Sequence, residues 1–467
     1  MLLIKQMFDR KNWPTIFVAA TAIGFAILKL STVTFRFSDG NAYFYMAQAL
    51  LHGILPYRDY NLADPPFLIL LFAPLKAIFA NNLILFQFIP IVLDISTAVL
   101  IYKILRRNNV RLAFLAPLVY LFSFTVISTS DYVTGGEVTV FLITLAIYFD
   151  QQKKNVASAI SWSLAILTKL YAVPPFIAYY LYKIVKRDYK AVLKITITGL
   201  IVAAIVLVPF ILASPSHFFY DILLHQLNRP PGISKWAIFG TFFREEFVLI
   251  ILAVIGMVIS RNKQLIFQAL LMLGFLLAYQ DLYYVYLHAL LPYMTIFGTV
   301  TFEYVYRKWG GKFVAAAVIV YILLLAIPTY SYFKDFEHQN IFSNSWDIAV
   351  AIRHSPENLP LYGTHEITPL LALIADRPIF GNYIDTNTQN FAALTLDKEK
   401  ISNEAVEKGV YLVAKVADYP PQYSIPLQGY ELYFDKDLFE RYCTLYESFP
   451  STAGDAYNKV NIYRCKK

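Results

Sequence analysis

Charged residues are scarce in this sequence of 467 residues. They make up 15% of the chain and hydrophobic residues 58%, whereas ordinary soluble domains carry roughly 25% charged residues. Cysteine occurs only twice, and the sequence contains no Walker, Rossmann or paired-cysteine zinc motif, no fixed-period repeat and no low-complexity linker. These absences argue against a water-soluble fold for most of the chain and leave chemistry on soluble nucleotides without support.

Long apolar runs recur over the first 330 residues. A helix of about 20 apolar residues crosses roughly 30 Å of hydrocarbon. No small-residue cleavage pattern follows the first run, so we interpret it as an uncleaved span. We predict a polytopic α-helical membrane protein with about 11 transmembrane helices, at residues 13–35, 83–104, 112–129, 138–149, 156–169, 171–185, 191–213, 239–260, 264–280, 285–305 and 313–330.

The distribution of positive charge predicts the orientation. Residues 1–330 carry 27 Lys and Arg against 14 Asp and Glu, and residues 331–467 carry 13 against 18. The basic residues form short clusters between apolar runs, a pattern that fixes membrane orientation and does not indicate nucleic-acid binding. With a cytoplasmic N-terminus, six clusters fall inside: Lys5/Arg10/Lys11, Lys103/Arg106/Arg107/Arg111, Lys153/Lys154, Lys183/Lys186/Arg187/Lys190/Lys194, Arg261/Lys263 and Arg307/Lys308/Lys312.

An odd number of spans places residues 331–467 outside the cytoplasm, in a multi-pass protein of the cell (plasma) membrane. The composition changes there to mixed apolar and polar runs, which predict a small soluble α/β or α+β domain after a transmembrane domain at residues 1–330. We expect strands at 359–362, 410–416, 444–449 and 460–464, and helices at 346–354 and 403–408. Cys443 and Cys465 flank the last two strands, which could pair as a hairpin and allow a disulfide; two free thiols are the alternative.

The first external loop is rich in polar and aromatic residues. Ser38 or Asp39 can cap a helix that runs to about Leu51 and ends at Gly53. Tyr43, Met46, Ala47 and Leu50 give this helix an apolar stripe, so we expect it to lie along the membrane interface. The apolar piece at 66–80 is too short to cross and should be interfacial or re-entrant.

These residues resemble a known family, the GT-C membrane glycosyltransferases, which include protein O-mannosyltransferases and aminoarabinose transferases. An acidic residue after the first span, an interfacial helix, a glycine and a Pro-Pro-apolar element occur in the order found in the family, although Gly40 and Asp64 depart from its usual residues. The matching positions are Asp39, Tyr43, Ala47, Gly53, Pro65-Pro66-Phe67, Gly135-Gly136-Glu137, Leu167-Thr168-Lys169 and the aromatic run from Tyr283 to Pro292.

The resemblance implies transfer of a sugar from a polyprenyl-phosphate donor to a lipid, glycan or protein acceptor at the extracytoplasmic face. Such a reaction needs a carboxylate to take the acceptor's proton and cations to stabilise the departing phosphate. Asp39 is our first candidate for the base and Glu137 the second. The predicted donor-phosphate and substrate-binding residues are Lys169, Arg58, Arg229, Asp64, Tyr284 and His288, with Arg244 as a further cation.

Other interpretations stay open at this stage. Asp39 could be only a helix cap, Lys169 could extend to the headgroups, and Glu137 could be a solvated loop carboxylate. Arg229 could be an ordinary surface residue, and the tyrosines near position 284 an aromatic belt. Asp94, within the second span, suggests an intramembrane ion pair. The whole chain could also be a transporter, a flippase or a noncatalytic glycan-binding membrane protein. A divalent metal is possible, but no tight ligand spacing indicates one, and we predict no required cofactor.

Overall fold

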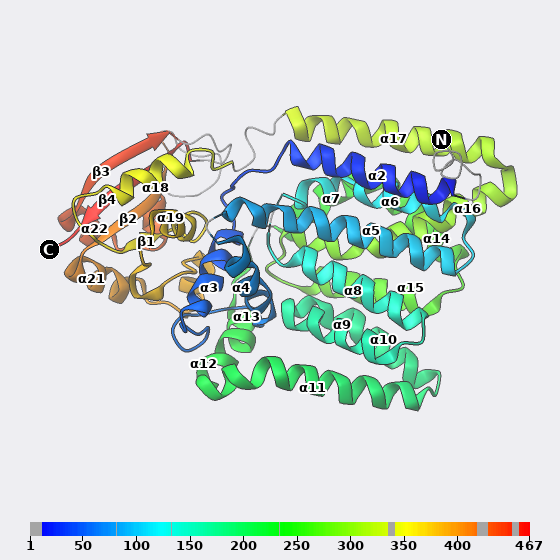
Figure 1. Cartoon of the computed structure of the whole chain (residues 1–467), viewed down its shortest axis with the longest axis horizontal. Helices are drawn as coiled ribbons and strands as arrows, with labels where there is room; N and C mark the ends of the chain where they lie inside the picture. The colour runs from blue at the N-terminus through cyan, green and yellow to red at the C-terminus, as the bar shows by residue number, and fades with distance from the viewer. Residues whose placement is uncertain are drawn as a thin grey trace.

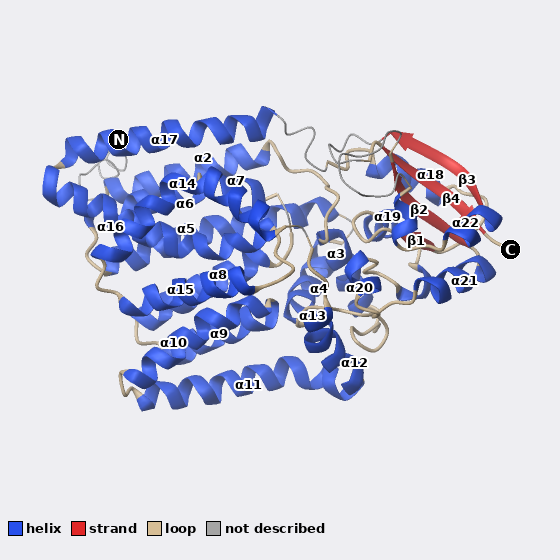
Figure 2. Cartoon of the chain, turned by 180° about the vertical axis from the view of Figure 1, so that it is seen from behind, coloured by secondary structure: helices blue, strands red, loops and turns tan. Residues whose placement is uncertain are grey.

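A computed structural model places a helical bundle at one end of the molecule and a smaller α/β domain at the other (Figures 1 and 2). The described residues are 12–80, 82–131, 133–232, 234–334, 341–417, 428–450 and 457–467. The predicted basic cluster Lys5/Arg10/Lys11 lies outside them.

Every predicted span coincides with helical structure to within several residues. Five helical stretches are long and apolar enough to cross a membrane: Trp13–Leu30, Leu83–Arg107, Tyr189–Ala213, Tyr284–Trp309 and Gly311–Lys334. The bundle helices are α2 (Trp13–Leu30), α5 (Ile89–Arg107), α6 (Ala116–Leu121), α7 (Phe124–Thr129), α8 (Gly136–Gln151), α9 (Asn155–Thr168), α10 (Val173–Val185), α11 (Tyr189–Ala213), α14 (Lys235–Ile259), α15 (Lys263–Ala278), α16 (Leu291–Trp309) and α17 (Gly311–Lys334).

The span expected at 112–129 is divided into α6 and α7. The hydroxyl of Ser123 accepts a hydrogen bond from the backbone N–H of Val126 at 3.3 Å and caps α7. A serine cap starts a new helix because its side chain satisfies an N–H group that has no partner within the helix. The break lies close to the cavity described below.

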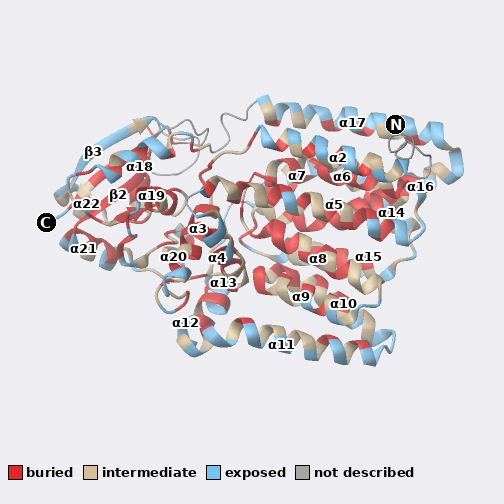
Figure 3. Ribbon diagram, viewed as in Figure 1, coloured by how far each residue is buried: buried red, intermediate tan, exposed pale blue. Residues whose placement is uncertain are grey.

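Apolar side chains cover the outside of the bundle. The outer helices α11 and α17 are exposed along much of their length (Figure 3), and Leu200 and Ile327, for example, are 67% and 70% exposed. A surface of this kind is suited to lipid, where exposed apolar groups cost nothing. The α10–α11 and α16–α17 turns, which carry two of the basic clusters, lie at the end away from the α/β domain (Figure 1), as the predicted sidedness requires.

The C-terminal domain is built on a four-stranded sheet in the order β1-β2-β4-β3. Strands β1 and β2 are parallel and the other pairs antiparallel, and the strands lie close to the predicted ranges. The elements are α18 (Ser345–Arg353), β1 (Leu361–Gly363), α19 (Thr368–Ala375), α20 (Thr388–Ala392), α21 (Lys398–Lys408), β2 (Val410–Val416), α22 (Lys436–Tyr442), β3 (Cys443–Pro450) and β4 (Lys459–Cys465).

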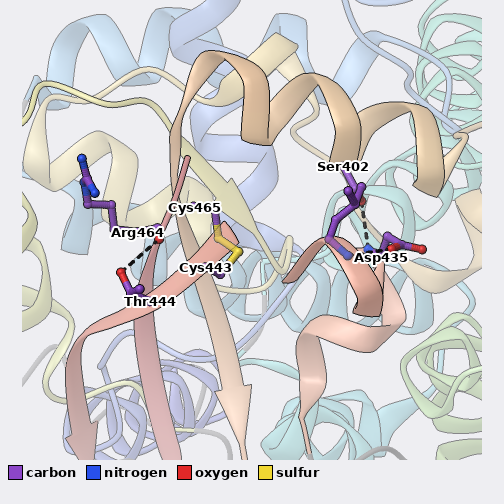
Figure 4. Close-up of a disulfide and its surroundings, with 7 residues drawn as sticks. Ser402, Asp435, Cys443, Thr444, Arg464 and Cys465 are labelled. Carbon is purple, nitrogen blue, oxygen red and sulfur yellow. Dashed lines mark hydrogen bonds between the residues drawn. A yellow bond between two sulfur atoms is a disulfide. The ribbon is translucent and has the colours of Figure 1, made fainter. Parts of the chain in front are cut away.

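Cys443 and Cys465 form a disulfide at paired positions of β3 and β4, so the free-thiol alternative does not describe the structure (Figure 4). The expected hairpin brings the two cysteines together. Nearby, the backbone N–H of Asp435 donates to the hydroxyl of Ser402 at 2.9 Å and ties α22 to α21.

The first external loop forms the two expected helices, α3 (Gly40–Leu51) and α4 (Phe67–Phe79), but α3 differs from the prediction in its surroundings. Its residues from Gly40 to Ala47 are all buried, and α3 packs against α4 and against α19 of the C-terminal domain. The amide of Asn41 donates to the backbone oxygen of Glu366 at 2.5 Å. The C-terminal domain therefore packs against one side of α3, whereas Tyr43 and Met46 of the predicted apolar stripe line the cavity described below.

Candidate active site

A cavity of about 1000 Å³ lies where the first external loop, the bundle and the C-terminal domain meet. Its lining includes five of the residues that the sequence singled out: Asp39, Asp64, Lys169, Arg229 and Tyr284. They come from chain segments far apart in the sequence, so only folding brings them to one place.

Asp39 stands at the start of α3. Its backbone oxygen accepts the N–H groups of Ala42 and Tyr43, but its side chain makes no capping hydrogen bond. The carboxylate instead faces the cavity, where the side chain is 54% exposed and Oδ1 lies 3.1 Å from Nε2 of His365. The helix-cap alternative therefore does not account for this side chain.

The Asp39–His365 contact is an ion pair at neutral pH. Burial acts to raise the pKa of Asp39, but the hydrogen bond and charge of His365, together with Lys169 and Arg229, hold it below its ordinary value of 3.8. Burial acts to lower the pKa of His365, but the bond to Asp39 and the surrounding carboxylates raise it to about 9. Asp39 is thus ionised and His365 protonated over the physiological pH range.

Lys169 enters the cavity because α9 ends just before it, at Thr168. Its backbone is extended, with φ −147° and ψ 130°, and its ammonium lies 2.6 Å from Oδ2 of Asp64 and 3.0 Å from the hydroxyl of Tyr43. The Tyr43 hydroxyl also donates to Asp64 at 2.8 Å, and that of Tyr57 to the backbone oxygen of Asp64 at 2.7 Å. Lys169 is therefore held within the cavity wall and does not extend to headgroups.

Arg229 is the second bundle cation in the lining. It pairs with Asp281 at 2.8 Å, and the two side chains are 13% and 2% exposed. Gln226 holds this loop in place, donating to the backbone oxygen of Ala63 at 2.7 Å and accepting from the hydroxyl of Tyr279 at 3.0 Å. Arg229 is a partly enclosed residue of the site, unlike the surface residue of the alternative interpretation.

The C-terminal domain contributes functional groups that our sequence reasoning missed. His365 and Glu366 follow β1, and Glu366 pairs with Lys415 of β2 at 2.6 Å. Asp385 also lines the cavity. The polar residues directly after the predicted strand 359–362 could have indicated His365 and Glu366, because loops that follow strands often carry functional residues.

The other predicted residues lie in different surroundings. The Tyr284 ring lines the cavity, but its hydroxyl is 3.0 Å from the hydroxyl of Thr125. Glu137 is buried and turns back toward the backbone N–H of Gly135 at 3.3 Å. Arg58 is exposed, pairs with Asp59 at 2.7 Å and is not among the lining residues.

His288 is buried within the bundle beside Asp94, for which the sequence suggested an intramembrane ion pair. Its Nε2 lies 3.2 Å from Oδ1 of Asp94 and 2.8 Å from the hydroxyl of Tyr120. His288 is not among the residues that line the cavity. In the described part of the chain, no group of three or more His, Cys, Asp or Glu residues is arranged to hold a metal ion, and the independence from metal stays a prediction.

Comparisons with known proteins agree with this architecture. The family model of glycosyltransferase family 87 matches residues 63–280. No curated protein sequence matches the chain. Two crystal structures of ArnT from Cupriavidus metallidurans, one bound to undecaprenyl phosphate and one in the apo state, superpose with TM-scores of 0.65 and 0.64. Each is 14% identical, and each match covers 97% of this chain and 98% of ArnT. The chain thus has the fold of ArnT, which agrees with the fold that the resemblance to GT-C enzymes implies.

Proposed function

We propose that this protein is a GT-C glycosyltransferase that moves a sugar from a polyprenyl-phosphate donor to an acceptor hydroxyl on the extracytoplasmic face of the membrane. The main observation behind this proposal is that one cavity, at the junction of the bundle and the C-terminal domain, contains a half-exposed, ionised Asp39 together with Lys169 and Arg229. The match to a glycosyltransferase family and the ArnT fold, seen there with undecaprenyl phosphate, support the same reaction class.

In the proposed reaction, Asp39 takes the proton of the acceptor hydroxyl. At the same time the oxygen of that hydroxyl forms the new bond to the anomeric carbon of the sugar. The bond from that carbon to the phosphate oxygen breaks, and the polyprenyl phosphate leaves with the electron pair. General-base catalysis needs the ionised carboxylate that the lowered pKa of Asp39 provides. Enclosure of the cavity also limits reaction of the donor with water.

Lys169 and Arg229 are the proposed partners of the donor phosphate. Lys169 is paired with Asp64, and Arg229 with Asp281. Each carboxylate orients its cation and balances the charge of that cation when no donor is bound. A phosphate accepts charge-assisted hydrogen bonds from both lysine and arginine side chains. These bonds stabilise the departing phosphate most strongly as negative charge develops on it.

His365 is proposed as the positioning residue for Asp39. It holds Oδ1 at 3.1 Å, so the other carboxylate oxygen can face the acceptor. Glu137 and His288 would support the cavity wall from behind, through the lining residues Thr134 and Thr129. Arg58, outside the lining, has no assigned part.

The proposed orientation places the C-terminal domain outside the cytoplasm of a multi-pass plasma-membrane protein, because the basic turns lie at the opposite end of the bundle. Sealed right-side-out vesicles test this: after mild reduction, a membrane-impermeant thiol reagent should label Cys443 and Cys465. Labelling only after the vesicles are opened would reverse the orientation.

The activity is tested with purified protein in lipid nanodiscs. Undecaprenyl phosphates carrying radiolabelled hexoses, pentoses or aminosugars are supplied with extracted envelope lipids and glycans, and release of undecaprenyl phosphate and labelled product is measured. We expect consumption of at least one donor by the wild-type protein, and equal consumption by Arg58→Gln. A folded wild-type protein that consumes none of these donors would contradict the proposal.

A further inference from the structure

Six consecutive polar residues of the C-terminal domain, from Asp385 to Asn390, all line the cavity. The segment leads into α20, and the hydroxyl of Thr386 donates to the backbone oxygen of Gly363 at 2.6 Å. Gly363 lies two residues before His365, so the segment is tied to the loop that holds Asp39. A molecule resting on this segment is therefore close to the proposed base.

Gln389 shows that the segment is prepared for a ligand. The residue is only 9% exposed, yet its side-chain amide oxygen has no hydrogen-bond partner within the described residues. The Tyr283 hydroxyl lies within hydrogen-bonding reach of the Gln389 side chain, and both residues face the cavity. Buried polar atoms in native structures normally have partners, so the unpaired amide oxygen of a residue that lines the cavity could be satisfied by a donor of a bound molecule.

Gly232 keeps room beside this position. A Cβ atom at Gly232 would lie 2.2 Å from Oδ1 of Asp281 and 3.8 Å from the amide nitrogen of Gln389. The first distance is far below van der Waals contact, so this backbone approaches the cavity wall as only glycine can without displacement. The loop from the bundle and the segment from the C-terminal domain thus form two sides of one site.

We propose that Asp385–Asn390, with Tyr283, is the subsite for a neutral, hydroxyl-rich glycosyl unit of the acceptor; this inference rests on the proposed transferase function. Amide and hydroxyl side chains both donate and accept hydrogen bonds, as sugar hydroxyls do. The rings of Tyr283 and Tyr286 in the same lining offer apolar faces for the C–H side of a sugar ring.

Charge decides against an anionic unit at this place. Asp385 lines the subsite, and the two cations of the C-terminal domain in the same lining, His365 and Lys415, are paired with Asp39 and Glu366. Carboxylates of this kind repel phosphate, sulfate or uronate groups, and like-charge placement is a known source of specificity. We assign Lys169 and Arg229 to the donor phosphate, and both belong to the bundle. Arg229 is already paired with Asp281. The segment therefore suits the acceptor rather than the phosphate end of the donor.

Binding is measured on the full chain in nanodiscs by saturation-transfer difference NMR. The probes are the methyl α-glycosides of glucose, mannose and galactose, with glucuronic acid as the anionic comparison. We expect signals from at least one neutral glycoside and none from glucuronic acid. Gln389→Ala and Thr388→Ala should each lower the signal about threefold or more, the scale of losing one or two hydrogen bonds.

Asn403→Ala is the matched control, because Asn403 is a polar residue of the same domain on α21 and outside the cavity lining. Its signal should equal that of the wild type, and thermal unfolding checks that all variants are folded. Equal signals from Gln389→Ala, Thr388→Ala and wild type, or no signal from any neutral glycoside, would overturn the subsite.

A final competition experiment tests whether the segment binds the acceptor or the sugar of the donor. Saturating undecaprenyl phosphoglucose or phosphomannose should leave the glycoside signal in place, and displacement would assign the segment to the donor's sugar and overturn our assignment. Because these measurements detect binding without transfer, a protein that binds glycosides but consumes no donor would contradict the proposed function and not the glycan site.

Discussion

The molecule contains two histidine–aspartate pairs of nearly equal geometry in different surroundings. Nε2 of His365 lies 3.1 Å from Oδ1 of Asp39 at the domain junction, and Nε2 of His288 lies 3.2 Å from Oδ1 of Asp94 inside the bundle. The side chain of Asp39 is 54% exposed, whereas that of Asp94 is 1% exposed. The same pair of side chains can serve chemistry or packing, depending on access.

The hydrogen-bond partners reinforce this difference. Asp94 also accepts from Tyr120 at 3.0 Å and from Ser130 at 2.6 Å, so both of its oxygens are used. Within the described residues, His365 provides the one hydrogen bond to the Asp39 carboxylate. A fully satisfied buried network fixes helices relative to one another, while an open carboxylate oxygen in a cavity can take a proton.

Neutralising the exposed carboxylate should have the greatest effect on turnover. Asp39→Asn keeps the size of the side chain and its ability to accept from His365, but it cannot take a proton. We expect transfer to fall about a hundredfold or more, the scale of general-base loss, in a protein that still folds and binds the donor. Radiolabelled transfer and donor binding measure this, and near-normal turnover by the folded variant would leave Asp39 without a catalytic part.

Removing the bundle cation should weaken the donor side of the same cavity. In Lys169→Gln the charge-assisted contact to the phosphate is lost, and we expect kcat/KM for the donor to fall roughly tenfold. The matched control is Arg58→Gln, since Arg58 is exposed and already paired with Asp59. Equal losses in the two variants would mean that the effect is general electrostatics and not contact with the donor.

Removing the imidazole of the exposed pair should change the pH dependence of transfer more than its maximum. Without the positive charge of His365, the pKa of Asp39 rises, so the acid limb of the kcat/KM profile should move to higher pH. We expect His365→Ala to lower kcat/KM about fivefold near neutral pH, the scale of one hydrogen bond. His365→Gln, which restores a donor without the charge, should recover rate but not the acid limb. An unshifted acid limb in both variants would contradict the positioning part of His365.

The same pair should stabilise the fold in a defined pH window. The pKa of His365 is raised from 6.5 to about 9 in the folded protein, so its contribution is complete below about 6.5 and is lost as the pH rises through about 9. The difference in unfolding temperature between wild type and His365→Ala should therefore shrink over that range, which differential scanning fluorimetry can follow. A difference that is constant from pH 6 to pH 10 would argue against the ion pair.

Disruption of the enclosed pair should affect stability and leave the chemistry nearly unchanged. Asp94→Ala leaves the buried side chains of His288, Tyr120 and Ser130 without their common acceptor, and a buried polar group without its partner costs about 1 to 3 kcal/mol. We expect a lower unfolding temperature but near wild-type transfer per folded molecule. A hundredfold loss of transfer in the folded fraction would place Asp94 in the reaction and remove the distinction between the two pairs.

Sequence reasoning succeeded where the signal is local. Apolar runs predicted the bundle helices, and short mixed runs predicted β2 at 410–416 and the β3–β4 hairpin that joins Cys443 to Cys465. It failed for α3, whose apolar stripe correctly indicated burial but not which part of the molecule buries it.

The candidate site was only partly predictable for the same reason. Asp39 and Lys169 stood out because they follow apolar helices where apolar residues would be easier to place, and the resemblance to GT-C enzymes supported both. Nothing local connects Asp39 to His365, 326 residues further along the chain. The partner of Lys169, Asp64, is separated from it by 105 residues.

The sequence by itself determined that this chain enters a membrane, roughly where its helices lie, and which side chains are costly to leave among apolar neighbours. These properties depend on hydrophobicity and backbone hydrogen bonding over a few turns or strands. The tertiary structure alone decided which of two similar histidine–aspartate pairs faces a cavity and which is enclosed. Access to a carboxylate depends on how distant segments pack, and no local pattern of residues encodes that packing.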